Sequence, residues 1–127
     1  MKKIIFTNNA PAPIGPYNQA VLVGNTLYTS GQIAINPATG DLVLDSIEVE
    51  TKQVMENMKA VLEAAAMTFS DVVKTSIFIS DMNDFAKINA VYGAYFDEKT
   101  APARETVQVA ALPKFVNVEI SMIAIKG

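Results

Sequence analysis

The apolar residues of this 127-residue chain follow two different periodicities, and their order along the chain limits the folds that are possible. Between residues 47 and 66 they recur at steps of three and four, which predicts an amphipathic helix of about five turns. A second segment with helical spacing follows residue 81. The segments before, between and after these two are rich in β-branched and aromatic residues, which favours strands.

The predicted order is one strand, a hairpin closed by Gly24-Asn25, a helix, a strand, a helix and two strands. Each helix joins two strands, which favours right-handed crossovers between parallel neighbours. The sequence therefore predicts an α+β fold, with a mixed sheet of five or six strands and both helices on one face. Asp45 and Glu48 have capping-box spacing at the first helix, and Asp81 can cap the second.

Half of the residues are apolar, yet no apolar run reaches the roughly 18–20 residues that span a membrane. The length predicts a single domain over residues 1–127. Residues 107–112 and 121–125 would leave apolar side chains on the sheet face without helices. We expect a second copy to bury that face in a homo-oligomer, with a well-filled monomer core as the alternative.

The charged residues are dispersed, and the net charge is −3. Binding to a phosphate backbone depends on clustered basic residues, so nucleic acid is not expected as a partner. The chain has no cysteine and no histidine, which removes disulfides, thiolate chemistry and imidazole ligands. The apolar run near the N-terminus is too short for a signal peptide, and we expect a cytoplasmic protein.

Arg104 is the only arginine, whereas the other nine basic residues are lysines. A guanidinium offers a planar fork that matches a carboxylate and stays protonated, so its natural role is to hold an anion. Pro102 stiffens the approach to it. The alternative is a surface or ion-paired arginine without a function of its own.

Other candidate residues carry weaker signals. Glu119 lies within an apolar strand and could position water from a partly desolvated site, or it could simply face solvent. Tyr17 follows a stiff Ile-Gly-Pro turn, and Ser30-Gly31 interrupts a strand where a ligand could approach the backbone. Asp81 and Asp84 are more typical of helix caps than of metal ligands, and no metal site is expected.

Several stretches together resemble the RidA/YjgF family of reactive-intermediate deaminases. The matching stretches are IGPYNQA (14–20), YTSGQIAINPATGDL (28–42), QVMENMKAVLEAA (53–65), SDVVKTSIFISDMNDFAKIN (70–89), PARETVQVAALPK (102–114) and VEISMIAI (118–125). They run in order over nearly the full length, and the combination is specific.

The resemblance implies a chorismate-mutase-like fold that assembles as a trimer around a central β-barrel, with sites between subunits. It implies hydrolysis of 2-imino or enamine acids, such as 2-iminobutanoate and 2-iminopropanoate, to 2-keto acids and ammonia, without cofactor or metal. An imine carbon is already electrophilic, so a protein without histidine or cysteine can do this chemistry. A non-catalytic protein that binds or senses small carboxylates such as 2-keto acids remains the alternative, and some relatives are described as ribonucleases or translation inhibitors.

By the same resemblance, Arg104 clamps the substrate carboxylate, while Glu119 orients or activates water with Tyr17 nearby. Substrate-binding roles fall to Ser30, Gly31, Asn89 and Thr106. Two positions depart from the family pattern. Ala101 stands where an aromatic residue often precedes the Pro-Ala-Arg motif. Ala66 replaces a common glycine after the first helix, so we expect that helix to end differently.

Overall fold

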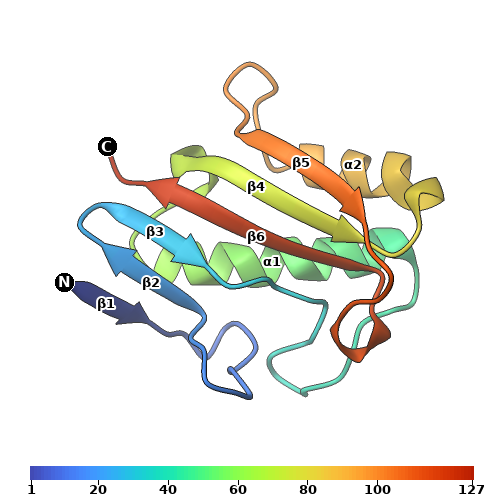
Figure 1. The fold of residues 1–127 in the computed structure, drawn as a ribbon, viewed down its shortest axis with the longest axis horizontal. Helices are drawn as coiled ribbons and strands as arrows, with labels where there is room; N and C mark the ends of the chain where they lie inside the picture. The colour runs from blue at the N-terminus through green and yellow to red at the C-terminus, as the bar shows by residue number, and fades with distance from the viewer.

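The computed structural model describes residues 1–127 as one six-stranded sheet with two helices packed on one face (Figure 1). The strands are β1 (Lys2–Ile5), β2 (Ala20–Val23), β3 (Thr26–Thr29), β4 (Val72–Ile79), β5 (Ala103–Gln108) and β6 (Val118–Ile125). The helices are α1 (Ile47–Ala64) and α2 (Phe85–Gly93), and short 3₁₀ turns cover Phe69–Asp71, Met82–Asp84 and Pro113–Phe115. The predicted fold class is confirmed, and no helix is both long and apolar enough to cross a membrane.

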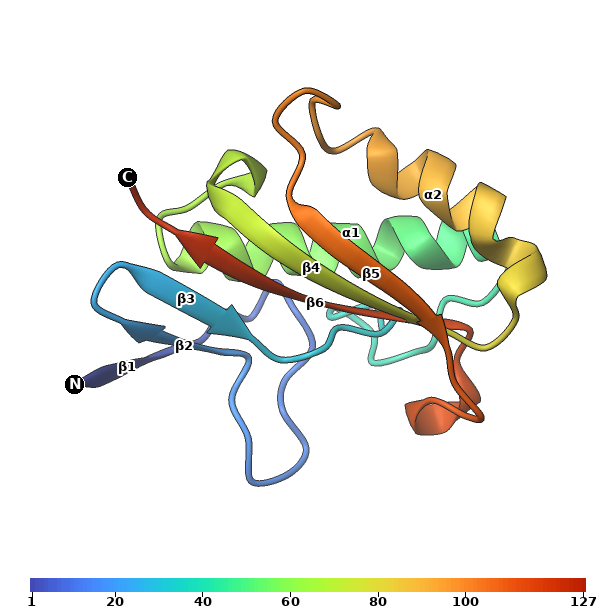
Figure 2. The ribbon, with the colours of Figure 1, turned by 45° about the horizontal axis from the view of Figure 1, so that its top comes forward.

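The strand order is β1-β2-β3-β6-β4-β5, and only the β4–β5 pair is parallel. Helix α2 joins these two parallel neighbours, as the sequence predicts. Helix α1 joins β3 to β4, and the prediction of neighbouring strands is wrong for this pair. The last strand, β6, returns between them and pairs antiparallel with both (Figures 1 and 2).

The two faces of the sheet differ in cover. On β4 and β6, alternate side chains such as Ile77 and Ile120 point to the helices and join the single buried apolar cluster. The opposite face, called here the open face, carries no helix (Figure 2). Its apolar side chains include Tyr28, which is 49% exposed, and Val107, which is 40% exposed. An uncovered apolar face is therefore present, as the sequence predicts.

Helix α1 begins one residue later than the capping-box prediction. Ser46, not Asp45, is the N-cap, and its Oγ accepts a hydrogen bond from Val49 N at 3.1 Å. The third helical residue is then Val49, which has no side chain to complete the box. At the second helix, Asp81 caps the short turn that leads into α2 by accepting from Asn83 N at 2.9 Å.

Helix α1 ends at an alanine in the left-handed region. Ala66 has φ 58°, and its N–H donates to Glu63 O while Met67 N–H donates to Leu62 O, both at 2.9 Å. These two bonds form a Schellman motif, which usually places glycine at this position. The expectation that the alanine makes the helix end differently is wrong, because the two capping bonds and the burial of Met67 hold the conformation.

Ala66→Gly is predicted to raise the free energy of unfolding by about 1 kcal/mol, since an L-residue in the left-handed region costs about that much. Ala64→Gly is the matched control, because Ala64 lies in the last turn of α1, where glycine lowers stability by about 1 kcal/mol. Urea denaturation at one protein concentration measures both. A loss of stability on Ala66→Gly would contradict this account.

Candidate functional site

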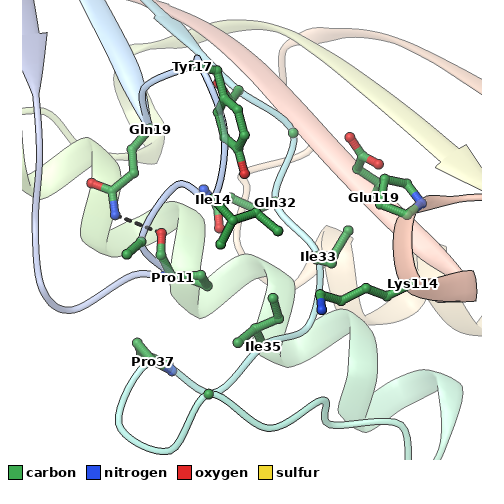
Figure 3. Close-up of a pocket in the computed structure, with 15 residues that line it drawn as sticks. Pro11, Ile14, Tyr17, Gln19, Gln32, Ile33, Ile35, Pro37, Lys114 and Glu119 are labelled. Atoms are coloured by element: carbon green, nitrogen blue, oxygen red, sulfur yellow. Dashed lines mark hydrogen bonds between the residues drawn. The ribbon is translucent and has the colours of Figure 1, made fainter.

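A cavity of about 760 Å³ opens between the N-terminal loop, the segment after β3 and the start of β6 (Figure 3). Four of the residues predicted from sequence line it, namely Tyr17, Ser30, Gly31 and Glu119. Three segments that are distant in sequence bring them together. The sequence-predicted set therefore gathers in part at one cavity.

Glu119 is the second residue of β6, and strand alternation directs its side chain to the open face. Burial raises the pKa of this carboxyl group. Gly31 packs directly against it, because a methyl group at Gly31 would overlap the carboxylate and lie 2.9 Å from Glu119 Cγ. A larger residue at position 31 would therefore force the Glu119 side chain to move. Within this chain, the group that approaches the Gly31 backbone is this acid.

The other two predicted residues at the cavity differ in how they are held. Tyr17 follows a turn closed by its N–H to Gly15 O at 2.8 Å, and its side chain is half exposed. Ser30 donates its hydroxyl to Asn18 O, and its N–H donates to Gln19 O at 2.9 Å. The Ser30 side chain thus fastens the loop before β2 to the segment after β3.

Two buried polar residues of α1 hold the walls of the cavity. Asn57 donates through Nδ2 to Ile35 O at 2.9 Å and Ile33 O at 3.2 Å. Two helical turns before Asn57, the Glu50 carboxylate accepts three hydrogen bonds. They come from Asn117 N at 2.7 Å, from Asn117 Nδ2 at 2.8 Å and from Val118 N at 3.2 Å. The second set fixes the backbone next to Glu119.

Sequence reasoning missed Glu50 and Asn57, although a signal was present. Both fall on the apolar stripe of α1 beside Val54, Val61 and other core residues, where a polar side chain needs a buried partner. It also missed Lys114, which lines the cavity from the turn before β6. Lys114 and Phe115 both have φ 55°, and this left-handed pair leaves no periodicity to detect in the sequence.

Arg104 lies elsewhere, on the edge strand β5 and on the helix side of the sheet. Its Nη1 donates to Asn89 Oδ1 at 2.6 Å, and its guanidinium carbon is 5.2 Å from the ring centre of Tyr92 and 5.6 Å from that of Phe85. No carboxylate pairs with it. Of the sequence alternative, the ion-paired arginine does not hold for this chain, whereas Arg104 is exposed and the surface arginine stays open.

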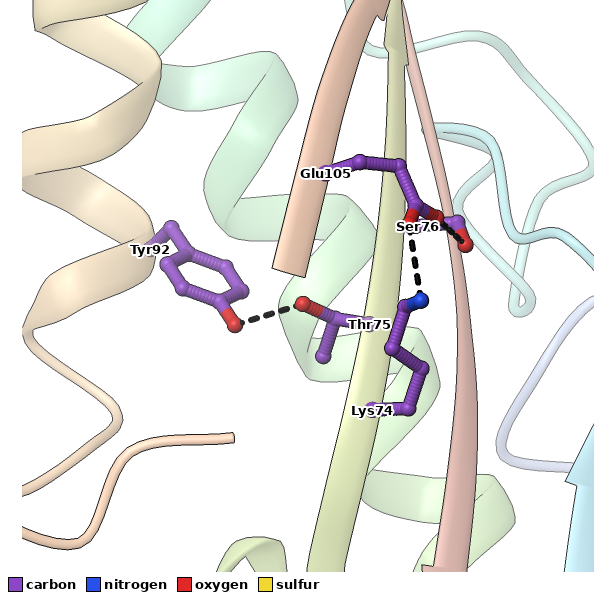
Figure 4. A network of polar contacts seen from close by, with 5 residues as sticks. All are labelled: Lys74, Thr75, Ser76, Tyr92 and Glu105. Atoms are coloured by element: carbon purple, nitrogen blue, oxygen red, sulfur yellow. Dashed lines mark hydrogen bonds and ion pairs between the residues drawn. The ribbon is translucent and has the colours of Figure 1, made fainter. Parts of the chain in front are cut away.

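The neighbouring acid, Glu105, is kept away by strand alternation. It points to the open face, where it pairs with Lys74 Nζ at 2.8 Å and accepts from the Ser76 hydroxyl (Figure 4). The hydrogen bond from Lys74 is the largest cause of the lowered pKa of Glu105, and the hydrogen bond from Ser76 is the next largest. The Arg104 guanidinium therefore has no counterion within the chain.

Thr106 shares the helix side of β5 with Arg104, and its Oγ1 is buried without a hydrogen-bond partner. Arg104, Asn89 and Thr106 form a second group of predicted residues, which does not line the cavity. The candidate residues are thus divided between two surfaces of one chain.

The strand register shows how far apart these surfaces are. Glu119 lies opposite Phe78 on β4, and Phe78 lies opposite Val107 on β5. With strands about 4.8 Å apart and residues about 3.3 Å apart, the Cα atoms of Glu119 and Arg104 differ by about 10 Å across the sheet and about 10 Å along it. Their side chains also point to opposite faces. One small ligand cannot contact both within a single chain.

Comparison with known proteins agrees with this architecture. The sequence profile of the family described as endoribonuclease L-PSP matches residues 7–126. The chain belongs to the RidA/YjgF family. The chain is 50% identical over 128 residues to 2-iminobutanoate/2-iminopropanoate deaminase of Escherichia coli, and the match covers 99% of both chains.

Solved structures of RidA/YjgF proteins share the fold. A putative endoribonuclease from Thermotoga maritima superposes with a TM-score of 0.97 at 49% identity, covering 100% of this chain and 99% of that one. The structure of Escherichia coli TdcF with bound serine gives 0.92 at 46% identity, covering 98% and 99%. The names of these relatives thus include both a deaminase and a ribonuclease.

Glu119→Gln is predicted to raise the free energy of unfolding at pH 7, because the wild type holds a partly desolvated charge there. Because the pKa of Glu119 is raised in the folded state, the charged carboxylate lowers the free energy of unfolding by its full amount only above that folded-state pKa. The cost shrinks as the pH falls through it and is absent below the ordinary carboxyl pKa of about 4.3. Denaturation of both proteins from about pH 7 down to below the ordinary carboxyl pKa of about 4.3 measures the difference.

Glu105→Gln is the matched control with the opposite sign. Its lowered pKa stabilises the folded state above the ordinary carboxyl pKa, and that stability is lost as the pH falls through the lowered value. The control should therefore be less stable than the wild type at pH 7 and equal to it in acid. If Glu119→Gln lost stability at pH 7 as well, the account of the Glu119 environment would be wrong.

Proposed function

We propose that this protein hydrolyses 2-imino acids, such as 2-iminobutanoate and 2-iminopropanoate, to 2-keto acids and ammonia. The observation that carries the proposal is that the chain has two separate surfaces, each with only part of the groups that an imine-hydrolysing site needs. One surface presents an acid-free guanidinium, and the other presents a half-buried carboxylate in a cavity. A substrate with a carboxylate beside an electrophilic carbon needs both groups.

Arg104 would bind the substrate carboxylate. Its guanidinium has five N–H donors, of which one is used by Asn89, so an Nη and Nε edge is free for two parallel hydrogen bonds. Asn89 holds the guanidinium through Nη1, and Thr106 follows Arg104 by two residues on the same side of β5. Holding the carboxylate in one orientation fixes the position of the neighbouring imine carbon.

Glu119 would act on water. As a carboxylate it takes a proton from a water molecule while the water oxygen bonds to the imine carbon and the C=N electron pair moves to nitrogen. The protonated Glu119 returns this proton to nitrogen, which gives a carbinolamine. Glu119 then takes the proton of the new hydroxyl group and passes it to the amino nitrogen, so the C–N bond breaks, ammonia leaves and the C=O bond of the 2-keto acid forms. Its raised pKa suits both transfers near neutral pH. Tyr17, Ser30 and Gly31 would border the reacting atoms.

The two surfaces would meet in an assembly of several copies, which we propose to be a trimer with its sheets facing inward. The separation of Arg104 from Glu119 and the uncovered apolar open face both support this arrangement. Each site would take its guanidinium from one copy and its cavity from the next. We propose that the protein works in the cytoplasm, since a chain without cysteine needs no oxidising compartment.

The names of relatives support this function over the alternatives. The Escherichia coli deaminase is 50% identical over nearly all of both chains, and TdcF was solved with a bound amino acid, serine. The description of the family as endoribonuclease raises RNA cleavage as a second possibility. The net charge of −3 and the dispersed lysines argue against RNA, and salt-dependent titration with RNA tests it.

Arg104→Ala is predicted to lower kcat/KM for imine hydrolysis by about 100-fold or more. Hydrogen bonds to charged groups contribute about 1.5–3 kcal/mol each, and two would be lost. Arg104→Lys should also lose most activity, because one ammonium cannot reproduce the fork. Imines generated by an amino-acid oxidase, with 2-keto acid and ammonia release as the signal, provide the assay.

Lys99→Ala is the matched control, since it removes one exposed positive charge from the turn before β5 without touching the guanidinium. It should retain wild-type activity. Full activity of either Arg104 variant would refute the proposed mechanism. Tight binding of a 2-keto acid by a wild-type protein that releases no ammonia would favour the sensor instead.

Mixing two inactive variants tests whether the site is shared between copies. Co-expression of Arg104→Ala with Glu119→Gln should restore activity, because about a quarter of the sites in a random assembly draw both intact groups from different neighbours. Arg104→Ala mixed with Arg104→Lys is the control, and it should restore nothing. Mixed assemblies of the first kind that stay inactive would show that each site belongs to one copy.

A further inference from the structure

Three residues of α2 surround the Arg104 guanidinium. Phe85, Asn89 and Tyr92 are spaced four and three residues apart, so they share one face of the helix. Asn89 accepts from Nη1, while the two rings lie against the guanidinium at 5.6 and 5.2 Å. A cation over an aromatic face is attracted by the ring, and planar arginine favours this contact.

A hydrogen bond to the sheet holds the Tyr92 side chain in place. Its hydroxyl shares a hydrogen bond of 2.8 Å with Thr75 Oγ1, and Thr75 is fully buried on β4 (Figure 4). In the parallel β4–β5 ladder Thr75 lies directly opposite Arg104. The hydroxyl of Tyr92 is thus fixed to the strand beside the arginine that its ring contacts. The contacts thus link Tyr92 of α2 to Thr75 of β4 and to Arg104 of β5, and these two strand residues are neighbours in the sheet.

This arrangement constrains the arginine without using up its donors. The two ring contacts use none of the N–H donors, which point outward in the plane of the guanidinium. Asn89 takes one donor, and no acid takes the others. The side chain of an arginine carries about 2 kcal/mol of rotamer entropy when free, so a preset orientation lowers the cost of binding an anion.

We infer that Tyr92 is a positioning residue, which aims the Arg104 guanidinium at the substrate carboxylate through its ring and its hydrogen bond to Thr75. This inference rests on the proposed function of Arg104. It assigns a role in substrate binding to a tyrosine that has no predicted contact with substrate. Its loss should weaken binding and leave the proton transfers at Glu119 intact.

Tyr95 provides a matched control on the same segment. Its hydroxyl donates to Glu56 Oε2 at 2.7 Å on the surface, and its ring packs edge-on against Phe69 at 5.2 Å, away from Arg104. Burial raises the pKa of both tyrosines, so neither substitution changes the charge at neutral pH. Tyr92→Leu and Tyr95→Leu therefore each remove one aromatic ring and one hydroxyl group. Only the ring of Tyr92 contacts Arg104.

Tyr92→Leu is expected to raise KM for the imine and the Kd for 2-oxobutanoate by about tenfold, with kcat within about twofold of the wild type. Tyr92→Phe, which keeps the ring, should raise both by about two- to fivefold. Tyr95→Leu should leave both constants unchanged. Steady-state kinetics and calorimetric titration measure these values, and urea denaturation checks that all three variants fold.

A double-mutant cycle separates positioning from general packing. If Tyr92 acts through Arg104, Tyr92→Leu should produce no further loss of kcat/KM in an Arg104→Ala background. An equal loss in both backgrounds, or unchanged KM and Kd in Tyr92→Leu, would overturn the inference while leaving the proposed function intact. Unimpaired activity of Arg104→Ala alone would instead overturn the proposed function. If Tyr92→Leu failed to fold, Tyr92→Phe in the same cycle would decide.

Discussion

Alternation along one edge strand keeps the only arginine of the chain separate from the acid beside it. On β5, Glu105 turns to the open face and pairs with Lys74 and Ser76, while Arg104 turns to the helices. If the two residues shared a face, an internal ion pair would neutralise the guanidinium. Because they do not, the fold presents a fixed positive group with free donors, held by rings and an amide.

The same principle explains why the carboxylate half of the candidate site lies elsewhere. Glu119 follows the register of β6 onto the open face, and buried polar side chains of α1 hold the backbone on both sides of its cavity. Glu50 and Asn57 therefore use hydrogen bonds to backbone, rather than apolar packing, to set the cavity walls. A chain that builds two well-fixed half sites on different faces is suited to complete them with another copy of itself.

Local patterns in the sequence predicted much of this, and non-local pairing accounts for most of what they missed. Helical periodicity located α1 and α2, and the apolar strand predicted around Glu119 is β6. Periodicity could not show that β6 inserts between β3 and β4, because strand order depends on pairing across the whole chain. The left-handed Ala66 was misjudged for a similar reason, since two capping bonds outweigh the local cost of the residue. Tyr92 is buried as a core residue on the apolar face of α2, yet its ring also contacts Arg104, which helical periodicity alone cannot show.

A structure of the assembled protein with 2-oxobutanoate bound tests the central claim most directly. We predict that the ligand carboxylate receives two hydrogen bonds from Arg104 of one copy, while its carbonyl carbon lies beside Glu119 of a neighbouring copy. A ligand held by Arg104 and Glu119 of the same chain, or bound in the cavity with the guanidinium elsewhere, would contradict the account.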